Sequence, residues 1–261
     1  MRIKKLWPAL LMAAVLLLGG CGGGDYKDQI AQINAGVEAL GELKNGHISV
    51  ATDIAAENAL VAGYDAHYIT DYYYEIVVKT FNFIAETRAL NDGAPGELIA
   101  PPYKVVDAHK YDLVTGVEDE EYDGDIGDFP DLLSFFFGAG LKSGYVGSVE
   151  PLNTEDHPDW QGFHVVKSDK YVERVNQSRS KHGADGIMLE SYVDYWLNAE
   201  GILVRMEYFS RDAVSQQPEG NENAEGAEGS PAAENIEDVI SQKYVFELNA
   251  YNDDSIPARF S

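Results

Sequence analysis

Apolar and polar residues alternate along two adjacent stretches of the chain, 187–197 and 202–209, which are separated by a polar turn at 198–201. Successive side chains of a β-strand point to opposite faces, so this alternation predicts a β-hairpin with one buried face. We expect the buried face of the first stretch to carry Ile187, Leu189, Val193, Tyr195 and Leu197.

Strand-like patterns recur along much of the remaining chain. The stretch 68–85, dense in Tyr, Val, Ile and Phe, suits a long strand or a tight pair of strands. Further strands are expected at 48–54, 103–113, 163–175 and 241–248. Helical spacing occurs near the N-terminus, where Asn45-Gly46 is expected to end the helix. The apolar stripe of this helix is Ile30, Ile33, Val37 and Leu40.

An acidic loop and a short apolar helix are expected in the middle of the chain. The loop runs from Glu118 to Asp128, and the helix that follows it ends at Gly138 and Gly140. Large apolar side chains on one helix face need a partner surface, so we expect this helix to plug the sheet or to cover a cavity in it. Its apolar face consists of Leu132, Leu133, Phe136 and Phe137.

Residues 215–235 contain no aromatic and no branched aliphatic residue. Such a stretch buries too little apolar surface to offset its ordering entropy, so it is predicted to be disordered. Strand patterns resume at Ser241, which makes the stretch a long loop within one domain that spans 25–261. The predicted fold class is α+β, with an N-terminal helix and the short mid-chain helix packed on a large antiparallel sheet.

Residues 1–20 have the pattern of an export signal, in which three basic residues precede an apolar run that ends at Leu18. The segment Leu18-Gly19-Gly20-Cys21 resembles the lipobox of bacterial lipoproteins. The resemblance implies that Cys21, the only cysteine of the chain, carries the lipid, palmitate included, and that 21–24 is a tether. We therefore expect an extracytoplasmic protein anchored by lipid to the bacterial cell membrane. In a cell with two membranes, Gly22 after the cysteine would permit transfer to the outer one.

The charge of the chain excludes one class of partner. All 44 acidic residues follow Cys21, whereas three of the 19 basic residues precede it, so the mature chain has 16 basic and 44 acidic residues and a net charge of −28. Nucleic-acid binding needs a basic face, so we expect no nucleic-acid partner. Acidity that serves only solubility is the simpler alternative to a functional role.

A family resemblance follows from the order of elements and from residues Ser191 to Tyr208, SYVDYWLNAEGILVRMEY. This aromatic strand, Gly turn and returning strand are similar to those of the lipoprotein-carrier (LolA-like) superfamily, which includes the mycobacterial glycolipid-binding lipoproteins. The resemblance implies a half-barrel, in which a strongly curved sheet wraps over helices with an apolar cavity between them. It also implies a lipid ligand.

Aromatic residues supply the candidate ligand contacts. Tyr72, Tyr73 and Tyr74 are consecutive and must occupy both faces of a strand. A tyrosine with a wet tip suits a ligand cleft, and it equally suits the rim of a plain core. The residues that we expect to bind a ligand are Tyr72, Tyr74, Phe136, Phe137, Tyr195 and Trp196.

The acidic loop offers one candidate metal site. Its carboxylates fall at alternate positions of a calcium-binding loop, with Gly124 at the bend, but Pro130 stands where a bidentate Glu belongs. A solvated loop without metal is the alternative. The candidate calcium ligands are Asp119, Glu121, Asp123 and Asp125.

Catalytic patterns are not apparent in the sequence. His109 and His164 fall in predicted strands, where we expect hydrogen-bonded structural roles. Ser178 and Lys181 match a Ser-x-x-Lys spacing, but we expect them in a polar connection between strands. The sequence therefore predicts a lipoprotein without catalytic residues or a cofactor that binds an apolar or amphipathic ligand such as a lipid. The alternative is an interaction or regulatory module for a protein or glycan of the cell envelope, with the protein partner unknown.

Overall fold

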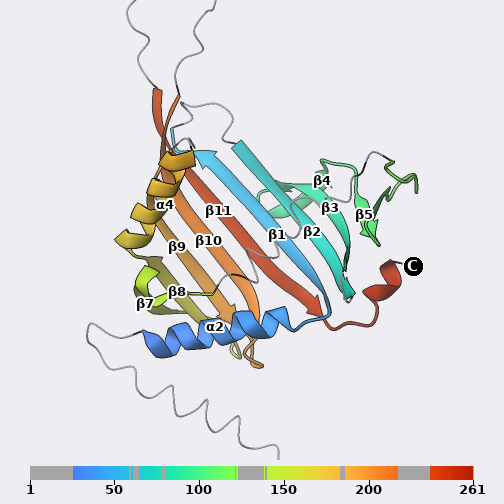
Figure 1. The fold of residues 1–261 in the computed structure, drawn as a ribbon, viewed down its shortest axis with the longest axis horizontal. Helices are drawn as coiled ribbons and strands as arrows, with labels where there is room; N and C mark the ends of the chain where they lie inside the picture. The colour runs from blue at the N-terminus through green and yellow to red at the C-terminus, as the bar shows by residue number, and fades with distance from the viewer. Residues whose placement is uncertain are drawn as a thin grey trace, which may run out of the picture.

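A large antiparallel sheet with two α-helices on one face dominates the computed structural model (Figure 1). In the part of the chain that the structure describes, the sheet is open, with β6 (His109–Asp112) at one edge and β7 (Val146–Leu152) at the other. The structure describes residues 26–58, 60, 65–77, 80–120, 122, 138, 140–182, 186–216 and 236–260.

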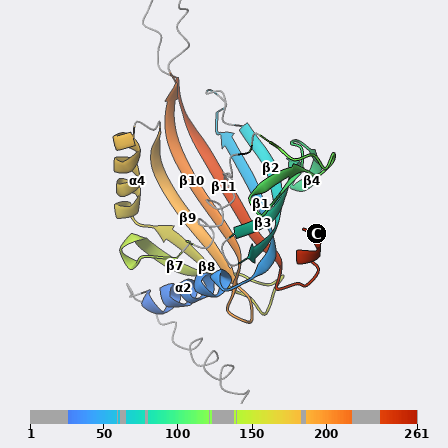
Figure 2. The same cartoon turned by 45° about the vertical axis from the view of Figure 1, so that its right-hand side comes forward.

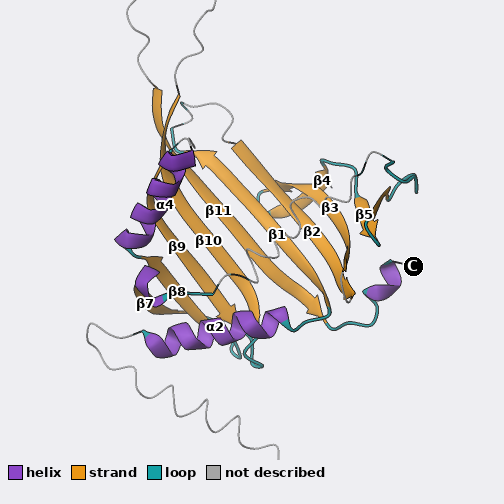
Figure 3. Cartoon of the chain, in the orientation of Figure 1, coloured by secondary structure: helices purple, strands orange, loops and turns teal. Residues whose placement is uncertain are grey.

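The sheet has 11 strands in the order β6-β5-β3-β2-β1-β11-β10-β9-β8-β7, and β4 pairs with β3 outside this path. The last strand of the chain, β11, lies between β1 and β10 at the centre of the sheet (Figure 3). The strands are β1 (Asn45–Ala56), β2 (Asp65–Val77), β3 (Thr80–Asn91), β4 (Ala94–Leu98), β5 (Tyr103–Val106), β6 (His109–Asp112), β7 (Val146–Leu152), β8 (Gln161–Lys167), β9 (Ile187–Leu197), β10 (Leu203–Gln216) and β11 (Ile236–Tyr251).

These bounds confirm the large antiparallel sheet and make the described chain mostly sheet. The stretch 68–85 forms the tight pair β2 and β3, and 187–209 forms the expected hairpin β9–β10. The single strand expected at 103–113 is wrong, because Asp107 and Ala108 have positive φ values of 51° and 66° and turn the chain between β5 and β6. Two-residue hairpin turns favour this left-handed conformation.

The N-terminal helix α2 (Lys27–Gly41) buries the predicted stripe Ile30, Ile33, Val37 and Leu40. Asn45-Gly46 does not end this helix, which is capped at Glu42; instead these two residues begin β1. Gly46 is needed there for close approach, because a Cβ at this position would lie 2.7 Å from Cε1 of the Tyr74 ring.

A second helix, α4 (Asp169–His182), replaces most of the strand that we expected at 163–175. The strand β8 stops at Lys167, and Ser168 then accepts a hydrogen bond from the backbone N–H of Tyr171, 3.4 Å from its Oγ. The motif Ser178–Lys181 therefore lies near the end of a helix that connects β8 to β9, so the connection between strands is polar as expected but helical. Two short 3₁₀ helices, η1 (Ser143–Tyr145) and η2 (Pro257–Arg259), complete the described helices.

The strand β9 changes the face it buries near its start. Tyr195 and Val193 are buried as expected, but Ile187 and Leu189 are 59% and 48% exposed, and Met188 is buried instead. The pairing with β10 shifts by one residue between Arg211 and Asp212, so β9 has an extra residue at this point. A bulge of this kind reverses the alternation of faces, which explains the error.

Both helices lie on the concave side of the curved sheet, which we call the inner face (Figure 2). The stripe of α2 joins the main buried cluster of inner-face side chains. On the opposite, outer face, charged pairs predominate, including His47–Asp71 at 2.9 Å and Lys243–Glu207 at 2.7 Å. In the described part of the chain, neither helix has the length and apolarity of a membrane span.

Several predicted segments lie outside the described residues. These are the export signal with Cys21 and its tether, most of the acidic loop, and the short apolar helix with Phe136 and Phe137. In the stretch predicted to be disordered, the prediction is wrong for Ser215 and Gln216, which belong to β10, and 217–235 lies outside the described residues.

Candidate functional site

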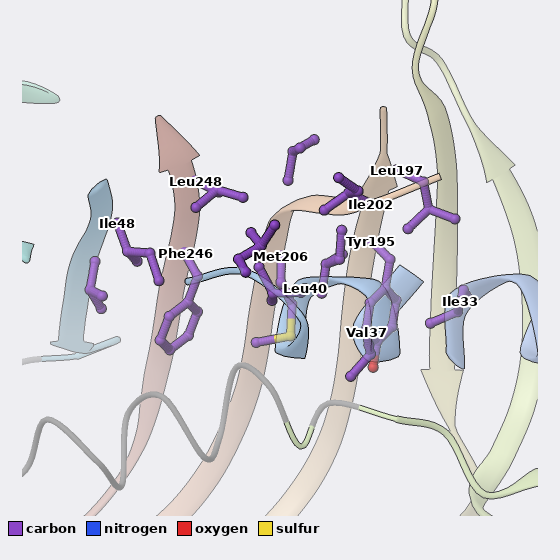
Figure 4. Close-up of a cluster of buried hydrophobic side chains, with 14 of the residues drawn as sticks. Ile33, Val37, Leu40, Ile48, Tyr195, Leu197, Ile202, Met206, Phe246 and Leu248 are labelled. Atoms are coloured by element: carbon purple, nitrogen blue, oxygen red, sulfur yellow. The ribbon is translucent and has the colours of Figure 1, made fainter. Parts of the chain in front are cut away.

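The inner face is apolar toward the end of the sheet that α2 covers (Figure 4). Tyr195 of β9 pairs with Met206 of β10, which pairs with Phe246 of β11. These side chains are at most 2% exposed. The same buried cluster continues over β1, β2 and β3 through Ile48, Val50, Tyr72, Tyr74, Phe83 and Ala85. A continuous apolar surface therefore crosses most of the width of the sheet.

A second row, made of three tyrosines and one threonine, crosses the inner face two residues further along each strand. Tyr208 of β10 pairs with Tyr244 of β11, which pairs with Thr52 of β1, and Thr52 pairs with Tyr68 of β2. The rings of Tyr208 and Tyr244 are 6.2 Å apart between centroids and only partly buried. Phenol rings of this kind present an apolar body and a polar tip, as at the boundary between an oily and a wet region.

Beyond the tyrosines the inner face becomes polar. Ser191 pairs with Ser210, and Ser210 pairs with Gln242. Both serines are at most 2% exposed, and Ser191 Oγ has no hydrogen-bond partner in the structure. Buried hydroxyls are normally satisfied, so this row has hydrogen-bonding capacity that the described residues leave unused.

The helix α4 is held over this polar region by an ion pair. Arg179 donates from Nη1 and Nη2 to the two carboxylate oxygens of Asp212, at 2.8 and 3.2 Å. Gln242 Nε2 donates to Asp212 Oδ2 at 2.7 Å. The carboxylate of Asp212 is 3% exposed, and its hydrogen bonds raise the pKa of Arg179. Such a bidentate pair is strong and directional.

Backbone contacts also fasten α4 to the sheet. The amide of Asn176 accepts from the N–H of Met188 at 2.7 Å and donates to its carbonyl at 2.9 Å. No residue of α4 is buried, so polar contacts rather than an apolar stripe hold this helix. Its start was detectable in the sequence as Ser168 followed by Asp169, a helix-capping signal, and its end as the basic last turn.

The predicted ligand residues are divided between the two faces. Tyr72, Tyr74 and Tyr195 lie on the inner face at 8%, 0% and 1% exposure, and burial raises the pKa of Tyr74 and Tyr195. Trp196 follows Tyr195 on the same strand and therefore lies on the outer face, where the Arg205 guanidinium stands 5.1 Å from its ring. The structure does not bring Trp196 together with the other candidates.

Where the structure describes them, the candidate metal ligands and the two strand histidines contact other side chains of the chain. Asp119 pairs with Lys110 at 3.2 Å, while Glu121, Asp123 and Asp125 lie outside the described residues. No group of three metal-ligating side chains occurs within the described part of the chain. The hydrogen bonds expected of the strand histidines are confirmed: His109 contacts Glu118 and His164 contacts Asp194, each at 2.6 Å.

Two hollows lie away from the inner-face rows. One of about 330 Å³ lies between the loop 153–160 and the outer face, and its lining includes Trp160, Trp196 and Arg205. The other, of about 480 Å³, lies at the ends of β9, β10 and β11 beside Val214 and Asp238.

No protein-family model matches this sequence, and no curated protein matches it. Among solved structures, the chain is similar to the crystal structure of a LolA superfamily protein from Nitrosomonas europaea. The sequence identity is 13%, the match covers 88% of this chain and 96% of the other, and the TM-score is 0.23.

Proposed function

We propose that this chain is a membrane-anchored, extracytoplasmic lipoprotein that binds an apolar or amphipathic ligand, such as a lipid, on its inner face without converting it chemically. The observation that carries the proposal is the inner face itself. Its apolar side chains extend over β1, β2 and β3, beyond the ends of β9 and β10 against which α2 packs. An apolar concave surface bordered by a few polar groups is the usual form of a small-molecule site.

The partly buried tyrosines Tyr208 and Tyr244 support access from the concave side, because their rings are not fully enclosed. We propose that Cys21 carries the lipid anchor and that the anchor keeps the folded domain at the membrane, where such ligands reside. No cofactor is needed for binding of this kind.

The direct test is lipid extraction of the purified full chain followed by mass spectrometry. We expect co-purified lipid with the wild type and a strong loss of lipid with Tyr244→Glu, which places a charge on the inner face. Tyr192→Glu is the matched control, since Tyr192 is a partly buried tyrosine on the outer face, stacked on Phe209 at 4.8 Å. Absence of lipid from the folded wild type would refute the proposal.

A different function has one observation in its favour. Trp160 and Trp196, the two tryptophans of the mature chain, line the same hollow of about 330 Å³ on the outer face, together with Arg205. Aromatic rings beside hydrogen-bonding groups suit a cell-envelope glycan, in line with an interaction module. Quenching of tryptophan fluorescence by glycan fragments, lost in Trp160→Ala, would favour this second function if lipid extraction yields nothing.

A further inference from the structure

The charge at the α4 end of the inner face differs from that of the chain as a whole. The chain has 44 acidic against 19 basic residues. At this end of the inner face, however, the printed contacts bring together Lys167, Arg179 and the carboxylate of Asp212. These three groups together carry a net positive charge on a strongly acidic protein.

Lys167 is the cation of this pair whose charge is not matched. It is the last residue of β8, and its Nζ lies 5.3 Å from the ring centroid of Tyr171 on α4. No carboxylate of the described residues lies within ion-pair distance of it, whereas both Nη atoms of Arg179 are occupied by Asp212. Burial lowers the pKa of Lys167 to about 8. A partly buried ammonium without a counter-ion is costly, and an anion from outside would relieve that cost.

The side chains around Lys167 would contact the same anion. Tyr171 shares a hydrogen bond with Tyr208, and both phenols stand near the guanidinium of Arg179. Phenol and ammonium groups donate hydrogen bonds to phosphate or carboxylate oxygens, and the Arg179 guanidinium adds a positive charge nearby. Lys167 joins this cluster from β8, Tyr208 from β10 and the other two residues from α4, so the cluster depends on the packing of α4 against the sheet.

The order of the rows orients a ligand. Along the strands, the inner face passes from the apolar row of Tyr195, Met206 and Phe246, through the row of Tyr208 and Tyr244, to the polar region under α4. An amphipathic molecule would match these three rows with its chains toward α2 and its headgroup toward α4.

We propose that the ligand is a lipid with a negatively charged headgroup, and that Lys167, with Tyr171 and Tyr208, binds this headgroup while the acyl chains extend past the partly buried Tyr208 and Tyr244 toward the apolar end of the inner face. This inference rests on the proposed function, because it names the class of lipid and its orientation.

The test measures which lipid the full chain extracts from vesicles. Delipidated protein is incubated with phosphatidylcholine vesicles that contain either phosphatidylglycerol or diacylglycerol, re-isolated, and its bound lipid is quantified by mass spectrometry. We expect capture of phosphatidylglycerol over diacylglycerol by the wild type. Lys167→Met should lower phosphatidylglycerol capture about tenfold, the factor that one charge-assisted hydrogen bond supplies.

Two variants separate a headgroup contact from a general loss of folding. Lys167→Arg keeps the charge and should retain the preference, and Lys181→Met removes an exposed charge from the end of α4 and should leave capture unchanged. Equal capture of both lipids by the wild type, or an unchanged preference in a folded Lys167→Met, would overturn the headgroup site and leave lipid binding intact. Capture of neither lipid would contradict the proposed function itself.

Discussion

Replacement of Gly36 by Ala tests how α2 packs on the sheet. Gly36 lies on the buried face of α2. A Cβ built on it would lie 2.4 Å from Cδ2 of Leu197, 3.0 Å from the carbonyl oxygen of Gly201 and 3.4 Å from the backbone nitrogen of Leu203. The Leu197 side chain can move, although it is buried, but the backbone of the β9–β10 turn cannot yield without disturbing the hairpin.

Two opposing effects determine the result. Ala is favoured over Gly inside a helix by about 1 kcal/mol, whereas overpacking of a filled site costs about 1–3 kcal/mol. Because one of the close atoms belongs to the backbone, we expect the cost to exceed the gain and the free energy of unfolding to fall by about 1 kcal/mol. Gly41→Ala is the matched control, since Gly41 ends the same helix and a Cβ there has no neighbour within 4 Å.

The assay is urea unfolding, followed by tryptophan fluorescence, to which Trp160 and Trp196 contribute from the folded domain. Gly41→Ala should be neutral or more stable than the wild type, and Gly36→Ala less stable. A Gly36→Ala variant as stable as Gly41→Ala would refute the close approach of α2 to the β9–β10 turn. It would also refute the packing of α2 over this end of the inner face.

Three further predictions concern the anchor and the α4 end of the inner face. Cys21→Ala should move the protein from the membrane fraction to the soluble fraction in detergent phase separation, and unchanged partition would contradict lipid anchoring. Arg179→Met should lower the free energy of unfolding by about 3 kcal/mol, because it leaves a buried carboxylate without its ion pair; Asp212→Asn in the same chain should recover part of the loss, and a double variant no more stable than the single one would count against the pairing. Capture of phosphatidylglycerol should weaken as the pH rises through about 8, the lowered pKa of Lys167, because its ammonium loses its proton, while Tyr171, with a pKa of about 12, keeps its own. Lys167→Arg should remove this pH dependence, and a flat profile in the wild type would show that Lys167 does not bind the headgroup.

The elements that could be predicted from the sequence are those whose own residues repeat with a clear period. The stripe of Ile30, Ile33, Val37 and Leu40 specified α2, and alternation from 187 to 197 specified β9 with its observed bounds. Each pattern lies within one segment, because a helix or strand that buries one face must place apolar side chains at the spacing of its own backbone.

The helix α4 carries no such pattern, since none of its residues is buried. It is stable because Arg179 reaches Asp212 and because Asn176 meets the backbone of Met188, contacts between segments that only the fold brings together. A polar helix held by partners distant in sequence leaves no apolar period to detect.

The division of neighbouring residues between two faces also depends on the assembled sheet. Tyr195 and Trp196 differ by one position, yet one faces the core and the other the outer surface, and the bulge near Met188 reverses which residues of β9 are buried. The rows that cross the inner face arise because β11, from the end of the chain, pairs between β1 and β10. Alternation is a local property of a strand, whereas the identity and register of its neighbours are set by hydrogen bonds and packing across the whole chain.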